Sequence, residues 1–405
     1  MVEDTHMKRI LLLPDTRKGQ GIGHLKRAFD VIELYEGTAR IVRPGSLQAG
    51  RADGDELDES DIASLTHLPK SRLFGNPDEA WDLIVVDRRS VSQELLLSLP
   101  PVPLVGLDVA RGERPWYGFL IDMLSSVPGH EANVFDPSLL RLPETTERQV
   151  PAHARRVLLS FGGEDPYDMT NRVYDLVGTL EGIEKITIVR GPRFSHDMPA
   201  DATVIDRPDG LIPHFESHDV LLTSFGLTAL EAAASGMPVL LVNPTSYHEE
   251  LAERTGFPSV GSPRPGASEL GMALSDLSHI AERSRSCVPS HRSSLAHFLS
   301  ELYTEDNRRC PACGSIRSIA LERFSRQTFF RCDECSLLFM KHFGGRQISY
   351  NEDYFFSDYE KQYGKTYLED FDHIRAMAGP RLRRIRKILG APGANGVRSH
   401  GPRLL

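Results

Sequence analysis

The chain has 405 residues, of which 40% are hydrophobic and 25% charged, and its formal net charge is −9. A chain of this length exceeds one compact core, so two or three domains are expected. The acidic balance argues against a dedicated nucleic-acid binder, and no apolar run reaches the roughly 18 residues of a membrane span. The N-terminus lacks a signal-peptide pattern and the cysteines are mostly paired as CxxC, so we expect a cytoplasmic protein.

The first predicted domain, residues 1–142, alternates short apolar runs with a helical pattern. Its predicted strands and helix are Arg9–Leu13, His24–Tyr35, Leu83–Asp87 and Leu104–Asp108. Strands alternating with helices indicate βαβ units around a parallel sheet. The proline-flanked segment Pro143–Pro151 is the predicted linker.

The second predicted domain, residues 152–304, repeats the same alternation. Its predicted elements are Arg156–Ser160, Met169–Leu180, Lys185–Val189, Val220–Thr223, Thr228–Ser235 and Pro238–Val242. Open α/β sheets bind ligands at the carboxyl ends of their strands. Two successive α/β halves therefore predict a substrate cleft between them.

A strand that ends in a small-residue turn is the most informative feature of the second half. The turn Ser224–Thr228 contains Gly226 and leads into an alanine-rich helix. Gly226 lets the backbone approach a ligand, and the first N–H groups of a helix have no intrahelical partner, so the turn suits an anion. Glu231, about one turn further on, can accept both hydroxyls of a ribose. The alternative is a plain capping box formed by Thr228 and Glu231.

Three alternating glycines, Gly19, Gly21 and Gly23, precede His24 in the loop after the first strand. Such a backbone can fold tightly and face a phosphate or a sugar. The spacing is not the dinucleotide fingerprint, because the final two-residue gap and the following acid are missing. Histidine suits a general base; the alternative is a histidine that caps the helix and points to solvent.

The segment Asp219–Glu250 resembles the C-terminal motif of family 28 glycosyltransferases and of the UDP-sugar hydrolase of the pseudaminic acid pathway. The matching residues are Asp219, Ser224, Gly226, Thr228, Glu231, Gly236 and Pro238. The resemblance implies an α/β fold of two Rossmann-like domains, the glycosyltransferase-B (GT-B) type. It also implies that Glu231 binds a ribose and that the turn holds a diphosphate, through Ser224, Phe225, Gly226, Leu227 and Thr228. In the following polar loop, where those families often carry a glutamine, this chain has His248, Glu249 and Glu250, and we expect His248 and Glu249 to contact the substrate.

The N-terminal loop, G-x-G-H-x-x-R, looks like the corresponding loop of the same families. In the pseudaminic-pathway hydrolase the histidine matching His24 is the proposed general base, and the resemblance assigns Gly21, Gly23 and Arg27 to the substrate. SFGGEDP, the opening loop of the second half, also resembles the hydrolase, and that resemblance implies that its glycine pair closes around the nucleotide. That pair is Gly162 and Gly163.

Three aspartates end strands of the first half. They are Asp15, Asp87 and Asp108. Asp15 is expected to line the substrate cleft, and Asp87 and Asp108 are weaker candidates for the same place. The alternative for all three is a plain helix cap.

Two CxxC pairs, separated by eighteen residues, follow the second half. They are Cys310 with Cys313 and Cys332 with Cys335. This spacing predicts a four-cysteine Zn²⁺ site in a ribbon spanning residues 305–345, with a structural role because no coordination position stays open. A redox CxxC would explain only half of these cysteines. Cys287 is expected to be inert.

The remaining sequence resembles the start of a class of S-adenosylmethionine-dependent methyltransferases, in which a zinc ribbon precedes a Tyr-x-x-x-Tyr-Phe motif. The matching positions are Tyr350, Tyr354, Phe355 and Tyr363–Phe371. The strand ending in Asp-x-Gly-x-Gly that would hold the cofactor does not follow. We therefore expect a truncated methyltransferase-like segment over 346–389, a basic helix over Arg381–Leu389, a disordered tail over 390–405 and no methyl transfer.

Together these features predict a glycosyltransferase that transfers a hexosyl group from a UDP-sugar donor to a small-molecule or glycan acceptor. One alternative is a UDP-sugar hydrolase that uses His24 as its base. Another is a non-catalytic scaffold that binds the nucleotide sugar without turnover. Neither nucleic acid nor a membrane is an expected partner.

Overall fold

The computed structural model describes residues 8–47, 56–208, 210–261, 264–302, 308–344 and 354–389. The chain forms two compact units, Met1–Gly345 and Arg346–Leu405. Tyr350 and the predicted tail over 390–405 lie outside the described residues.

The first sheet has seven parallel strands in the order β3-β2-β1-β4-β5-β6-β7. They are β1 (Arg9–Pro14), β2 (Thr38–Val42), β3 (Phe74–Gly75), β4 (Leu83–Asp87), β5 (Leu104–Leu107), β6 (Phe119–Asp122) and β7 (Val134–Phe135). The helices are α1 (Gly23–Leu34), α2 (Glu59–Ala63), α3 (Lys70–Leu73) and α4 (Gln93–Ser98), with 3-10 turns η1 (Arg114–Trp116) and η2 (Pro137–Leu139).

The central strand β4 shows why this sheet forms. Successive side chains of a strand point to opposite faces. Leu83 and Val85 pack into one apolar cluster, and Ile84 and Val86 into another on the opposite face. A strand buried on both faces is typical of a parallel sheet covered by helices.

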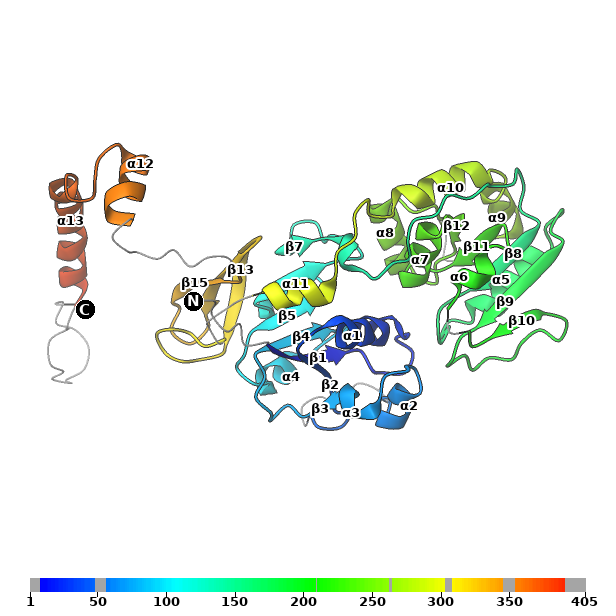
Figure 1. Cartoon of the computed structure of the whole chain (residues 1–405), viewed down its shortest axis with the longest axis horizontal. Helices are drawn as coiled ribbons and strands as arrows, with labels where there is room; N and C mark the ends of the chain where they lie inside the picture. The colour runs from blue at the N-terminus through cyan, green and yellow to red at the C-terminus, as the bar shows by residue number, and fades with distance from the viewer. Residues whose placement is uncertain are drawn as a thin grey trace. The chain divides into compact units, whose positions relative to one another are not determined.

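The second sheet has five parallel strands in the order β10-β9-β8-β11-β12. They are β8 (Arg156–Ser160), β9 (Lys185–Arg190), β10 (Thr203–Asp206), β11 (Val220–Thr223) and β12 (Val239–Leu241). The helices are α5 (Met169–Gly178), α6 (Ile212–Phe215), α7 (Leu227–Ala234), α8 (Ser246–Thr255), α9 (Ala267–Ala273) and α10 (Leu277–Ser286). The fold class is therefore α/β as expected, with two Rossmann-like domains that are each built around a parallel sheet (Figure 1).

Three of the seven predicted strands have the predicted bounds, and the other four differ by one residue at one or both ends. Several helix ends were also wrong. The helix predicted over Met169–Leu180 ends at Gly178, where the N–H of Thr179 bonds back to the carbonyl of Leu176. Glycine is a poor helix former, so the last turn tightens there. Helix α13 (Phe371–Leu389) begins well before the predicted Arg381 and contains Pro380; a proline removes one backbone hydrogen bond and can kink a helix without ending it.

Helix α11 (Leu295–Glu301) packs against the first domain, although it lies in the range predicted for the second. Figure 1 shows α11 beside α1, and the rings of Phe298 and Phe119 are 6.3 Å apart. Lys8 also donates to the carbonyl of Ser300 at 2.7 Å. The predicted domain bounds remain a prediction.

The cysteine-bearing segment forms a three-stranded antiparallel sheet of β13 (Ser318–Phe324), β14 (Gln327–Cys332) and β15 (Leu338–His342). The second unit contains a π-helical turn, η3 (Tyr354–Asp358), α12 (Tyr359–Tyr363) and α13. Among the described helices, including the 19-residue α13, none combines the length and apolar content that crossing a membrane requires.

Candidate active site

His24 and Asp87 form the centre of the candidate site in the first domain. His24 lies in the first turn of α1, and Asp87 is the last residue of β4. His24 Nδ1 lies 2.6 Å from Asp87 Oδ1. The loop between β1 and α1 therefore returns the histidine to the carboxyl end of the neighbouring strand, because β1 and β4 pair in parallel with Pro14 opposite Asp87.

Arg27, one turn along α1, links two aspartates. Its Nη2 donates to Asp87 Oδ1 at 2.5 Å, and its Nη1 forms a short contact with Asp108 Oδ2. Asp108, which follows β5 with φ at 47°, also accepts the backbone N–H groups of Met123 (2.8 Å) and Leu124 (2.9 Å). Arg27 was expected to contact the substrate; the structure shows it buried as the bridge between these two carboxylates.

The charges in this network determine the protonation of Asp87. Burial alone would raise the pKa of Asp87, but the nearby Arg27 and His24 hold that pKa below its usual value. An ionised carboxylate can only accept, so His24 Nδ1 carries the proton of the shared hydrogen bond. In the neutral ring Nε2 then keeps its lone pair, and the side chain remains 17% exposed. This arrangement can remove a proton from a bound hydroxyl or water.

Asp15 is held by its own loop. Its carboxylate accepts Arg17 Nε at 2.8 Å and Arg17 Nη2 at 2.6 Å, and also the backbone N–H of Arg89 at 3.1 Å. Burial favours a raised pKa for Asp15, but these donors hold its pKa below the usual value. We expected Asp15 to line the cleft, and the structure shows it joining two loops of the first domain.

The glycine loop adopts the backbone that its sequence favours. Gly19 and Gly21 have φ values of 84° and 79°, in the left-handed region. The N–H of Gly21, expected to face a phosphate, donates to Glu164 Oε2 at 3.2 Å. A carboxylate of the second domain therefore supplies the negative charge at this position.

Helix α7 begins without a side-chain cap. Gly226 occupies the N-cap position, and neither Ser224 nor Thr228 forms a capping hydrogen bond. The capping-box alternative for Thr228 and Glu231 is therefore wrong. Glu231 forms a short ion pair with Lys26 of α1, a residue that the sequence analysis missed although it stands two positions after His24.

Phe225, predicted to bind the diphosphate, is a core side chain. It is buried and meets Phe257 edge-on, with ring centroids 6.2 Å apart. Its backbone N–H donates to Asn243 Oδ1 at 2.8 Å. Asn243, also missed by the sequence analysis, fixes the shape of this turn from the end of the next strand.

The polar loop supplies internal contacts. His248 is buried, with Nδ1 2.7 Å from Thr245 Oγ1 and Nε2 3.2 Å from Arg89 Nη2. Burial, with the charge of Arg89, lowers the pKa of His248 to about 4. Glu249 accepts Asn243 Nδ2 at 2.7 Å and Ser259 Oγ at 2.8 Å. Both His248 and Glu249 thus have protein partners where substrate contacts were predicted.

The glycine pair of SFGGEDP permits a close backbone approach. Gly162 has φ at 87°. A Cβ on Gly163 would lie 2.7 Å from the side chain of Ile22, and one on Gly191 would lie 2.5 Å from Gly163 Cα. Gly23 has more room, since a Cβ added there would lie 3.6 Å from the side chain of Leu227.

The four predicted cysteine ligands come together. The Sγ atoms of Cys310, Cys313, Cys332 and Cys335 all lie within 4.8 Å of one another. Two of the separations, Cys310–Cys335 and Cys313–Cys332, are 3.6 Å. A tetrahedral metal with sulfur ligands at about 2.3 Å has edges of roughly 3.8 Å, so the cluster fits such an ion.

Comparisons with known proteins identify no family. No family model matches the chain. An uncharacterized protein of Methanocaldococcus jannaschii, MJ1062, is 24% identical over 119 residues, which are 27% of this chain. The chain spans about a quarter, 24%, of the length of that relative.

Several solved structures resemble the chain in part. The spinosyn rhamnosyltransferase SpnG has a TM-score of 0.47 at 14% identity, covering 72% of this chain and 98% of its own. The glycosyltransferase SnogD from Streptomyces nogalater has a TM-score of 0.43 at 14% identity, covering 73% and 99%. Arabidopsis thaliana UGT89C1, complexed with UDP-L-rhamnose, has a TM-score of 0.43 at 13% identity, covering 73% and 99%.

Proposed function

We propose that this chain is a glycosyltransferase that transfers a hexosyl group from a UDP-sugar to an acceptor hydroxyl. The observation that carries the proposal is the Nδ1–carboxylate hydrogen bond of His24 and Asp87, which leaves Nε2 of a partly exposed imidazole to act as a base. A histidine oriented in this way by a carboxylate is suited to proton transfer.

In the proposed reaction the acceptor oxygen attacks the anomeric carbon of the sugar while its proton passes to His24 Nε2. The bond between the anomeric carbon and the diphosphate oxygen breaks, and its electron pair leaves with UDP. Asp87 stabilises the imidazolium that forms. Water in place of the acceptor hydroxyl would make the same chemistry a hydrolysis.

The N-terminus of α7 is the proposed diphosphate site. The uncapped start at Gly226, with Ser224 and Thr228 beside it, offers backbone N–H groups and the positive end of the helix dipole. Glu231 would accept the ribose hydroxyls. Lys26, which now pairs with Glu231, lies on the helix that carries His24, so a bound nucleotide would contact both domains.

Zn²⁺ is the proposed ion of the cysteine cluster. Four thiolates complete a tetrahedral shell and leave no open position, so the ion would hold the ribbon together and take no part in sugar transfer.

Calorimetry with UDP tests the nucleotide site. The wild type should bind UDP, and Glu231→Ala should weaken binding by about tenfold or more, which is the value of one lost charge-assisted hydrogen bond. Glu253→Ala, at an exposed glutamate of α8, is the matched control and should bind as the wild type does. A folded wild type that binds no nucleotide would end the proposal.

Release of UDP from a panel of UDP-sugars tests the reaction. His24→Ala should abolish release, and His67→Ala, at a largely exposed histidine, should not. Release only when an acceptor is present indicates the transferase, and release into water alone indicates the hydrolase. UDP binding without any release would support the alternative of a non-catalytic scaffold that binds the nucleotide sugar.

A further inference from the structure

The cysteine ribbon is joined to the first sheet through the side chain of Asn133. Its Nδ2 donates to the carbonyls of Phe324 (2.8 Å) and Gln327 (3.2 Å) in the β13–β14 hairpin. Its Oδ1 accepts the N–H of Leu120 in β6 at 2.8 Å. Because Asn133 is buried, separating the ribbon from the first sheet would leave its amide group without hydrogen-bond partners.

A hydrogen bond and ring packing join the ribbon to the residues around the start of β6. Thr328 Oγ1 donates to the carbonyl of Gly118 at 2.7 Å. The ring of Phe343 lies 5.2 Å from that of Phe119, and a Cβ on Gly118 would meet Phe343 at 3.1 Å. The start of β6 is therefore fitted to the ribbon with little free space.

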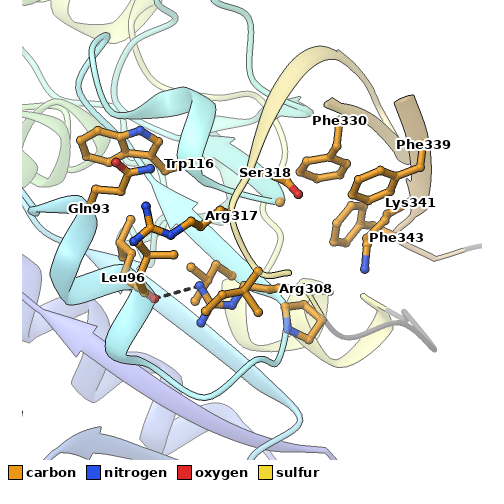
Figure 2. Close-up of a pocket in the computed structure, with 15 residues that line it drawn as sticks. Gln93, Leu96, Trp116, Arg308, Arg317, Ser318, Phe330, Phe339, Lys341 and Phe343 are labelled. Atoms are coloured by element: carbon orange, nitrogen blue, oxygen red, sulfur yellow. Dashed lines mark hydrogen bonds between the residues drawn. The ribbon is translucent and has the colours of Figure 1, made fainter. Parts of the chain in front are cut away.

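Figure 2 shows a cavity of about 40 Å³ at the same junction, which is also lined by Gly118 and Phe343. Arg308 donates there to the carbonyls of Leu96 (2.8 Å), Leu99 (2.7 Å) and Pro100 (2.8 Å) in and after α4. Phe330, Phe339 and Phe343 of the ribbon lie together on the other side of the cavity. The junction thus extends from the start of β6 to α4 and the segment after it.

Arg323 connects the ribbon to a buried ion pair. Its Nη2 donates to the carbonyl oxygens of Arg114 (2.5 Å) and Tyr117 (2.9 Å). The guanidinium of Arg114 forms a two-point ion pair with Asp122, at 3.0 and 2.9 Å, and both side chains are 1% exposed. Arg323 therefore fixes the segment from which Arg114 reaches Asp122.

Asp122 is the last residue of β6 and directly precedes the turn whose backbone N–H groups bind Asp108. The N–H groups of Met123 and Leu124 bind one oxygen of Asp108, and the other oxygen binds Arg27. Arg27 in turn binds Asp87, the partner of His24. Contacts thus run without a break from the ribbon to the histidine.

We propose that Arg323 is a positioning residue for His24, and that the metal-binding ribbon supports the active site by presenting Arg323 to the η1–β6 segment. The catalytic part of this inference rests on the proposed function; the structural coupling does not. Burial raises the pKa of Asp122 to about 6, and Arg114 and Arg323 both act against that rise. Loss of Arg323 would therefore also weaken the ion pair between Arg114 and Asp122.

Hydrogen exchange of the Met123 and Leu124 amides measures this coupling directly. In the full chain, Arg323→Met should speed their exchange at least tenfold. Arg323→Lys keeps a positively charged nitrogen donor and should speed the exchange less. Arg317→Met removes another ribbon arginine, one that is largely exposed beside Glu334, and should leave both amides unchanged. Unchanged exchange in a folded Arg323→Met protein would overturn the proposal.

Metal removal tests the role of the ribbon. Treating the purified chain with a chelator should speed exchange of the same two amides, and adding Zn²⁺ should restore their protection. The amides of Leu221 and Leu222, in β11 of the second sheet, should not respond. If the chelated protein protects Met123 and Leu124 as before, the ribbon does not support this turn.

Steady-state kinetics of UDP release tests the catalytic part of the proposal. In Arg323→Met the kcat for UDP release should fall about tenfold while the KM for the UDP-sugar stays the same, and Arg323→Lys should recover part of the kcat. An unchanged kcat alongside faster amide exchange would refute the positioning role. If the wild type shows no turnover, the proposed function fails, while the exchange experiment still decides the coupling.

Discussion

His24 and Asp87 share a hydrogen bond of 2.6 Å although 63 positions separate them in the chain. The parallel pairing of β1 with β4 brings them together, because it aligns the ends of both strands and so places the start of α1 beside Asp87. In the proposed reaction the two residues act as the base and its orienting carboxylate. Arg27 contacts both Asp87 and Asp108.

Asp87→Asn should lower kcat for UDP release by about 10² to 10⁴, the usual contribution of general-base catalysis. An amide can donate to Nδ1, which would move the imidazole proton to Nε2 and block the base. The same change leaves Arg27 paired with Asp108 alone, so a loss of stability on the order of 3 kcal/mol should accompany it. Kinetics and urea unfolding measure the two effects; an Asn variant with wild-type kcat would contradict the assignment of Asp87.

The metal content of the purified chain should be close to one zinc ion per molecule. Cys332→Ser, which removes a buried ligand, should abolish binding, because three thiolates no longer complete the shell. Cys287→Ser is the matched control, since Cys287 lies outside the cluster. Elemental analysis of the three proteins gives the answer, and equal zinc in Cys332→Ser and the wild type would contradict the site.

His248 should make the protein less stable in mild acid. Its pKa in the fold is about 4, whereas an unfolded histidine titrates near pH 6.5. Between these values the unfolded chain binds more protons, so stability falls as the pH drops from about 6.5 to 4, by up to about 3 kcal/mol. His248→Gln cannot take up this proton and should flatten that part of the profile.

Urea unfolding at several pH values compares His248→Gln with the wild type. His67→Gln, at a largely exposed histidine, serves as the control and should keep the wild-type slope. Parallel profiles for His248→Gln and the wild type would mean that His248 already accepts a proton in the folded protein.

Gly191→Ala should destabilise the second domain by about 1 to 3 kcal/mol, the usual cost of overpacking. The new Cβ would lie 2.5 Å from both Cα and the carbonyl oxygen of Gly163, and backbone atoms cannot turn aside as a side chain can. Gly178→Ala, where no atom of the described residues lies within 4 Å of the added Cβ, should be neutral or slightly stabilising. Thermal unfolding distinguishes these outcomes, and a neutral Gly191→Ala would show that the loop has room to move.

The sequence by itself determined the local features of this protein. The apolar residues Leu83–Val86 of β4 and the alternation of strands and helices predicted two parallel sheets. The cysteine spacing predicted the cluster that forms. Such features depend on residues within a few positions of each other, and a periodic pattern or a fixed spacing is enough to encode them.

Only the tertiary structure decided which side chains meet. No local pattern shows that Asp87 orients His24, that Asn243 and Ser259 bind Glu249, or that α11 returns to the first domain. These partners depend on strand register and on helix packing between distant segments, which one sequence does not display. Phe225 and His248, both predicted to contact the substrate, have buried side chains with partners inside the protein, because a group enclosed by protein must find its partners there.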